Sequence, residues 1–167
     1  GFVPEERKVE GIITDSTIGL NITVASYDQL AIGGHVVRRR EAQRAQEAVL
    51  RVGVVPADSS RVMESLSGGN QQKAILGRWI SREGIRVLLL DDPTRGVDVG
   101  AKTQIYQLLD EMAANGVGIL FASSDEEEIL GVADRIHVLR RGEIVHSAPT
   151  SDLSLHELTT LIVGGQI

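Results

Sequence analysis

Two stretches of this sequence combine residue types that could handle a phosphate group. In the first, residues 66–73, a serine and two glycines stand where a helical pattern begins. The start of a helix directs free backbone N–H groups and a positive dipole end at an anion, and glycine lets the anion approach closely. Ser67 would add a hydroxyl donor. A serine before small residues is also an ordinary helix N-cap, and this stretch taken alone favours the ordinary cap.

The second stretch, residues 87–94, is an apolar run that ends in Asp91, Asp92 and a proline. Ligands of open α/β sheets collect at the carboxyl ends of the strands. Neighbouring side chains on a strand point to opposite sides, so one carboxylate could face a Mg²⁺ ion through water and the other an attacking water. A plain turn is the alternative, and the apolar run, typical of a buried strand, favours the catalytic interpretation.

The hydrophobic pattern predicts the elements that position these stretches. Before Ser81 the pattern is mainly helical, and after it apolar runs alternate with helical segments, which is typical of a parallel sheet with crossover helices. The predicted helices cover residues 22–32, 41–52, 69–80, 101–114 and 126–130, and the predicted strands cover residues 87–90 and 117–122. The sequence therefore predicts an α/β fold.

Both ends of the chain carry further signals. Residues 136–139 and 143–145 predict a hairpin that closes one edge of the sheet, followed by a helix over residues 155–162. Residues 1–4 are typical of the end of a buried strand and include no methionine, which predicts that the chain is part of a longer protein.

Composition excludes several classes of site. The chain of 167 residues has no cysteine, and its four histidines show no ligand spacing, which argues against disulfides and a His or Cys metal site. Its net charge of −6 argues against nucleic acid as a partner, and the basic run at residues 38–40 is typical of a charged helix start. No apolar run is long enough to span a membrane, so a cytoplasmic location is expected.

The two stretches occur together, separated by one helix, and here the sequence resembles the ATP-binding cassette (ABC) ATPases. Residues 66–73 resemble the family signature, residues 87–91 the Walker B strand, and Val97-Asp98 the D-loop. Residues 1–8 resemble the segment around the Q-loop. The forms Gly-Gly-Asn-Gln-Gln-Lys and Pro-Thr-Arg-Gly-Val-Asp-Val-Gly-Ala-Lys resemble the second cassette of monosaccharide importers for ribose, galactose or xylose.

This resemblance implies a P-loop NTPase-like fold, in which a partial parallel-sheet core carries a helical subdomain. Residues 1–80 would hold the Q-loop region and the helical signature subdomain. Residues 81–147 would form the Walker B part of the core, and residues 148–167 a helical tail.

The resemblance also implies ATP and Mg²⁺ as ligands. Asp91 would serve the metal, and Asp92 and Ser124 would be catalytic, at the positions of the family's glutamate and switch histidine. The nucleotide-binding residues would be Ser67, Gly68, Gly69, Asn70, Asp98 and Glu5. In the family two cassettes sandwich ATP head to tail, so the signature would serve a nucleotide held by the partner cassette.

The sequence departs from the family at several of these positions. A Gly-rich Walker A loop is absent, so this chain alone is expected to bind ATP poorly. The carboxylate of Asp92 is set back by about 1.5 Å relative to a glutamate. Ser124 cannot become a cation near neutral pH, and Glu5 stands where a glutamine is usual. These changes predict one competent ATP site, completed by Ser67, and one weak site.

The expected function is therefore that of an ATP-hydrolysing subunit of a sugar importer at the cytoplasmic face of the inner membrane. Its expected partners are transmembrane permease subunits, which would lie near residues 10–26, a second cassette, and indirectly a periplasmic or extracellular sugar-binding protein. One alternative is a nucleotide-independent module that docks on the permease. Another is a DNA-repair or chromosome ATPase, which the acidic charge and the lack of heptads disfavour.

Overall fold

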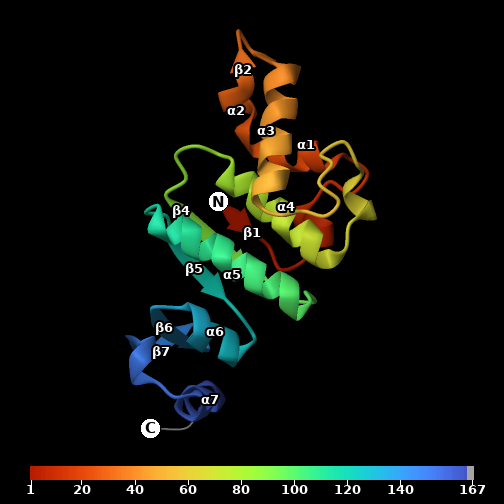
Figure 1. The fold of residues 1–167 in the computed structure, drawn as a ribbon. Coiled ribbons are helices and arrows are strands. Elements are labelled where there is room, and N and C mark those ends of the chain that lie inside the picture. Colours follow the sequence, from red (N-terminus) through yellow and green to blue (C-terminus); the bar gives the residue numbers. More distant parts are fainter. Residues whose placement is uncertain (165–167) are drawn as a thin grey trace. The chain divides into compact units, whose positions relative to one another are not determined.

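The computed structural model describes residues 1–164, and these divide into two compact units at Ala122 and Ser123. In Figure 1 the first unit runs from red through green to the strand β5, and the second includes the hairpin β6–β7 and the helix α7. None of the helices within residues 1–164 is long and apolar enough to cross a lipid bilayer.

The first unit contains a parallel sheet of three strands, β1 (Phe2–Val3), β4 (Val87–Asp91) and β5 (Gly118–Ala122), in the order β1-β4-β5. The helix α5 (Val99–Ala114) crosses over between β4 and β5, because two parallel strands cannot be joined by a tight turn. This arrangement confirms the predicted α/β fold with a parallel sheet.

Side chains of β4 alternate between a buried and an exposed face. Leu88 and Leu90 are buried in the core, whereas Val87 and Leu89 are 51% and 41% exposed. The run was interpreted as a buried strand, and the structure shows that only one of its two faces is buried.

The helical part of the first unit consists of α1 (Ile18–Thr23), α2 (Tyr27–Leu30), α3 (Arg38–Arg51) and α4 (Gly68–Ile80). One continuous helix over residues 22–32 was expected, and this prediction is wrong. The segment is broken into the end of α1, a 3₁₀ turn (Val24–Ser26), α2 and the strand β2 (Ala31–Ile32). The strand β2 pairs with β3 (His35–Val36) around Gly33 and Gly34, whose positive φ angles suit a two-residue hairpin turn.

One hydrophobic core joins the helical part to the sheet. Its fully buried members include Ile22, Val49, Leu76, Leu88 and Ile105, from α1, α3, α4, β4 and α5. A 3₁₀ turn (Met63–Ser65) contributes the fully buried Met63 to the same core, and a π-helical turn (Arg7–Gly11) follows β1. The predicted boundary near Ser81, between the helical subdomain and the Walker B part of the core, lies inside this one compact unit. The division into these two subdomains stays a prediction.

The second unit consists of α6 (Glu126–Val132), β6 (Arg135–Arg140), β7 (Glu143–Pro149), a 3₁₀ turn (Thr150–Asp152) and α7 (Leu155–Val163). The predicted hairpin is confirmed, but the prediction that it closes an edge of the parallel sheet is wrong. The strands β6 and β7 form an antiparallel sheet of their own, whose Ile136 and Val138 pack against Leu158 and Leu161 of α7. The hairpin thus covers its apolar face within its own unit.

Candidate functional site

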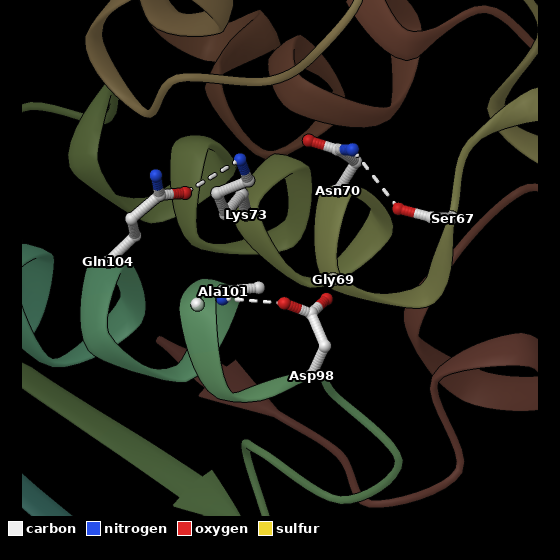
Figure 2. A pocket seen from close by; sticks show the side chains of 8 residues that line it. Ser67, Gly69, Asn70, Lys73, Asp98, Ala101 and Gln104 are labelled. Atoms are coloured by element: carbon white, nitrogen blue, oxygen red, sulfur yellow. Dashed lines mark hydrogen bonds between the residues drawn. The ribbon is translucent and has the colours of Figure 1, made fainter.

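The starts of α4 and α5 meet at a pocket of about 290 Å³ in the first unit (Figure 2). Four of the predicted nucleotide-binding residues line it, together with four residues that sequence reasoning did not select. The predicted residues are Ser67, Gly69, Asn70 and Asp98, and the others are Lys73, Gly100, Ala101 and Gln104.

The first turn of α4 is open toward a ligand. Ser67 is the extended N-cap of this helix, but among the described residues its side chain accepts no hydrogen bond from an α4 amide. The Ser67 Oγ instead accepts a 3.1 Å hydrogen bond from Asn70 Nδ2 (Figure 2). The first N–H groups of a helix have no partner within the helix, so they can bind an anion when the cap side chain leaves them open.

Glycine is required where α4 meets α5. A Cβ on Gly69 would lie 2.7 Å from the Cβ of Ala101 and 3.3 Å from Asp98 Oδ2. A Cβ on Gly68 would lie 2.6 Å from a guanidinium nitrogen of Arg7. The two glycines therefore allow the segment at Arg7 and the start of α5 to approach the signature closely.

Asp98 is the N-cap of α5. Its Oδ1 accepts a 3.0 Å hydrogen bond from Ala101 N, and its side chain extends toward Gly69 in Figure 2. A carboxylate at this position satisfies a free helix N–H group and interacts favourably with the helix dipole.

Lys73 and Gln104 are site residues that the sequence did not reveal. Lys73 is 4% exposed, and its Nζ donates to the carbonyl of Gly53 at 2.5 Å and to Gln104 Oε1 at 3.0 Å. Burial lowers the pKa of the Lys73 ammonium below its usual value, and the negative charge of Asp98 offsets part of this effect. The available signal is spacing, since Lys73 follows Gly69 by one helical turn and so lies on the same face.

The predicted residue Glu5 is bound outside this pocket. Its carboxylate forms an ion pair with Arg95, and Arg7 Nη1 donates a 2.8 Å hydrogen bond to the Arg95 carbonyl. Arg7, which the sequence did not reveal either, also lines a second depression of about 260 Å³ together with Gly68 and Gly96. The Q-loop-like segment is thereby connected to the turn that precedes Asp98.

The two aspartates lie at the carboxyl end of β4, as predicted from the sequence. Asp91 is exposed and ends the strand. Asp92 has a left-handed backbone with φ 44°, which is uncommon for residues other than glycine and is less costly for Asp and Asn. Its N–H donates to the Ala122 carbonyl at 2.9 Å, and its carbonyl accepts from Arg95 N at 3.1 Å. These bonds hold the strand exit in a tight turn.

Neither aspartate lines the pocket at α4 and α5, and Ser124 belongs to the second unit, where it is exposed just before the α6 N-cap Asp125. Among residues 1–164, no group of three or more His, Cys, Asp or Glu side chains is placed to hold a metal ion. Mg²⁺ bound to a nucleotide is usually held by one or two carboxylates together with phosphate oxygens and water, so it does not require such a group.

The chain is similar to known importer subunits. No family model matches it. It is 43% identical over 155 residues to the arabinose import ATP-binding protein AraG of Rhizobium meliloti, covering 93% of this chain and 30% of that protein. It is 49% identical over 142 residues to AraG of Shigella boydii, covering 84% of this chain and 28% of that protein. The chain thus spans less than a third of the length of the relatives it matches.

Solved structures share the fold. An inward-facing metal-chelate type ABC transporter matches 98% of this chain and 63% of its own chain, with a TM-score of 0.80 at 21% identity. A dimeric ATP-binding cassette bound to ADP and phosphate matches 90% of this chain and 62% of its own, with a TM-score of 0.73 at 22% identity. The chain is therefore homologous to the AraG proteins over most of its own length, and it has the P-loop NTPase fold of the ABC ATPase domains.

Proposed function

We propose that this chain is part of an ATP-binding and ATP-hydrolysing subunit of an ABC sugar importer. The observation that supports this function best is the open first turn of α4, where Ser67 and Gly69 line the pocket beside Asp98. The AraG proteins, which are 43–49% identical to this chain, are named as ATP-binding proteins of arabinose import. This relationship supports a monosaccharide as the transported substrate.

The pocket suits the terminal phosphate of an ATP molecule held by a second cassette. The α4 amides and the Ser67 hydroxyl would bind phosphate oxygens, and the absence of a Cβ at Gly69 keeps the approach open. Lys73 supplies a positive charge beside Asp98, which reduces the repulsion between that carboxylate and a phosphate.

The metal-binding and catalytic carboxylates of this chain's own nucleotide site would lie at the carboxyl end of β4. Mg²⁺, when bound with the nucleotide, neutralises charge on the phosphates, and Asp91 would hold it with phosphate oxygens and water. Asp92 would orient the attacking water, and Ser124 would take the switch position. A carboxylate set back by about 1.5 Å favours slow hydrolysis at this site, because misplacement on the order of 1 Å can cost about a hundredfold in rate.

Assembly follows from the same proposal. The subunit would pair with a second cassette, dock on transmembrane permease subunits at the cytoplasmic face of the inner membrane, and act indirectly on a sugar-binding protein outside it. Residues 10–26, which include α1, would lie near the permease.

The test is sugar-stimulated ATP hydrolysis by the full-length subunit reconstituted with its permease and sugar-binding protein. Ser67→Ala should lower kcat at least about tenfold, the cost of one hydrogen bond to a charged group. Ser65→Ala is the matched control, since Ser65 is exposed and its Oγ donates to the Val62 carbonyl outside the pocket. Equal rates for the Ser67→Ala and unmodified subunits would contradict the proposal and leave the nucleotide-independent docking function as the better explanation.

A further inference from the structure

Asn70 and Lys73 both bind the loop that follows α3. They lie three residues apart on α4, a spacing that places side chains on the same face of a helix. Asn70 Oδ1 accepts a 3.0 Å hydrogen bond from Val55 N, and Lys73 Nζ donates a 2.5 Å hydrogen bond to the Gly53 carbonyl. One side chain thus binds a backbone donor of this loop and the other a backbone acceptor.

The same two side chains also bind the walls of the pocket. Asn70 Nδ2 donates to Ser67 Oγ at 3.1 Å, and Lys73 Nζ donates to Gln104 Oε1 of α5 at 3.0 Å, as Figure 2 shows. The loop after α3 is therefore linked through Asn70 to the signature serine and through Lys73 to the helix that Asp98 caps.

Burial of the charged Lys73 ammonium group costs desolvation free energy. Lys73 is 4% exposed and has no ion-pair partner among the described residues, and its hydrogen bonds to Gly53 and Gln104 go to neutral oxygens. An apolar side chain of similar length would avoid the desolvation cost of the ammonium group. Packing alone therefore does not account for a lysine here, whereas directional bonds to Gly53 and Gln104 do.

We propose that Asn70 and Lys73 are positioning residues that clamp the loop at residues 53–55 to α4 and α5 and thereby set the placement of the Ser67 hydroxyl. This inference rests on the proposed function for its effect on catalysis, but the clamp itself does not depend on nucleotide. Because this loop directly follows α3, the clamp links the end of α3 to the phosphate-facing end of α4.

The clamp is tested first without nucleotide, by amide hydrogen exchange in the full-length subunit. Asn70→Ala removes the acceptor of the Val55 N–H group, so exchange at residue 55 should accelerate by about tenfold, the equivalent of one hydrogen bond of about 1.4 kcal/mol. Asn70→Asp keeps that acceptor and should keep the protection. Equal exchange at residue 55 in the unmodified and Asn70→Ala subunits would overturn the clamp, whatever the outcome of the Ser67→Ala test.

Its role in positioning is tested by kinetics and stability together. Lys73→Met should lower kcat about tenfold or more and leave the unfolding midpoint equal or higher, because a buried charge has been removed. Gln104→Leu removes the side-chain acceptor of Lys73 Nζ and should lower kcat as well. The double variant Lys73→Met/Gln104→Leu should be no slower than Lys73→Met alone, since both substitutions break the same contact.

Arg39→Met, at an exposed position near the start of α3, controls for loss of a positive charge and should leave kcat unchanged. If Lys73→Met matches the unmodified subunit in kcat, or loses activity only in proportion to lost stability, Lys73 has a packing role and the inference is wrong. If Ser67→Ala leaves kcat unchanged while Asn70→Ala accelerates amide exchange at residue 55, the proposed function is wrong and the clamp is supported.

Discussion

Gly69 lies directly against the carboxylate of Asp98. One Asp98 oxygen accepts a hydrogen bond from Ala101 N at 3.0 Å, and the other would lie 3.3 Å from a Cβ placed on Gly69. The start of α4 and the start of α5 can share one pocket because neither glycine nor the capping aspartate places a bulky group between them. The distances at this contact make it sensitive to a single methyl group.

Gly69→Ala should separate the two helix starts. Its Cβ would lie 2.7 Å from the Ala101 Cβ, closer than such atoms approach in proteins, so the free energy of unfolding should fall by about 1–3 kcal/mol. Denaturant unfolding of the purified chain measures this change. Gly100→Ala is the matched control in the same pocket, because its Cβ would stand at an ordinary 3.4 Å from Asp98 Oδ1. Equal stability of the two variants would show that α4 and α5 are not in close contact.

Lys73 should make stability depend on pH in the alkaline range. Burial lowers the pKa of its ammonium in the folded state, so between that pKa and the usual 10.5 the unfolded chain binds more protons than the folded chain. The free energy of unfolding must then rise with pH in this window, and the cost of the buried charge is present in full below it. The measurement is the difference in unfolding free energy between the unmodified chain and Lys73→Met, from pH 7 to 10.5.

That difference should increase in favour of the unmodified chain as the pH approaches 10.5. All other titrating groups are common to both proteins, so their contributions cancel as long as Lys73→Met leaves their surroundings unchanged. A difference that stays constant across the range would mean that Lys73 is solvated in the folded chain.

In the second unit, α7 begins with a reciprocal capping box. The Ser154 side chain accepts from Glu157 N, and the Glu157 carboxylate accepts from Ser154 N at 2.8 Å and from Ser154 Oγ at 2.6 Å. The hydroxyl and amide bonds from Ser154 lower the pKa of Glu157 below its usual value. Ser154→Ala should raise that pKa, which a carbon-detected NMR titration of Glu157 can follow.

The lowered pKa of Glu157 should make the stability of the second unit depend on pH. A lowered carboxyl pKa stabilises the folded unit above the usual glutamate pKa, and this contribution is lost as the pH falls through the folded-state pKa. Ser154→Ala should therefore lower the unfolding midpoint of the second unit most at neutral pH and less at acid pH. Thr160→Ala, farther along α7, retains both capping bonds and should leave the pKa of Glu157 in place.

The core of the first unit should depend strongly on α4. Leu76 is completely buried among side chains of the helices and the sheet, so Leu76→Ala should lower the free energy of unfolding by about 2–5 kcal/mol through lost burial and a residual cavity. Leu50→Ala removes the same atoms from a side chain that is 62% exposed, and it should change stability by much less. Similar losses for both variants, measured by denaturant unfolding, would contradict the described packing.

Sequence patterns predicted the elements whose hydrophobic period is strong. The helix at residues 69–80 is confirmed as α4 and the basic run at residues 38–40 as the start of α3, because amphipathic spacing and charge act over a few neighbouring residues. The segment at residues 22–32 was predicted wrongly, since several short elements share one apolar stretch there and the period alone does not separate them. Asp91 and Asp92 were correctly predicted at the end of a strand for the same local reason.

Tertiary structure decided which of these residues meet. Lys73 binds the carbonyl of Gly53, 20 positions earlier, and the amide of Gln104, 31 positions later, and no local pattern relates residues at such distances. The ion pair of Glu5 with Arg95 and the separate sheet of β6 and β7 likewise depend on the tertiary structure and not on a local sequence pattern. By itself, the sequence determined the backbone propensities and the chemical groups at the helix start and the strand end. The pocket at α4 and α5 exists only because packing of the shared core brings those groups together, since side-chain contacts depend on the whole fold and not on neighbouring residues.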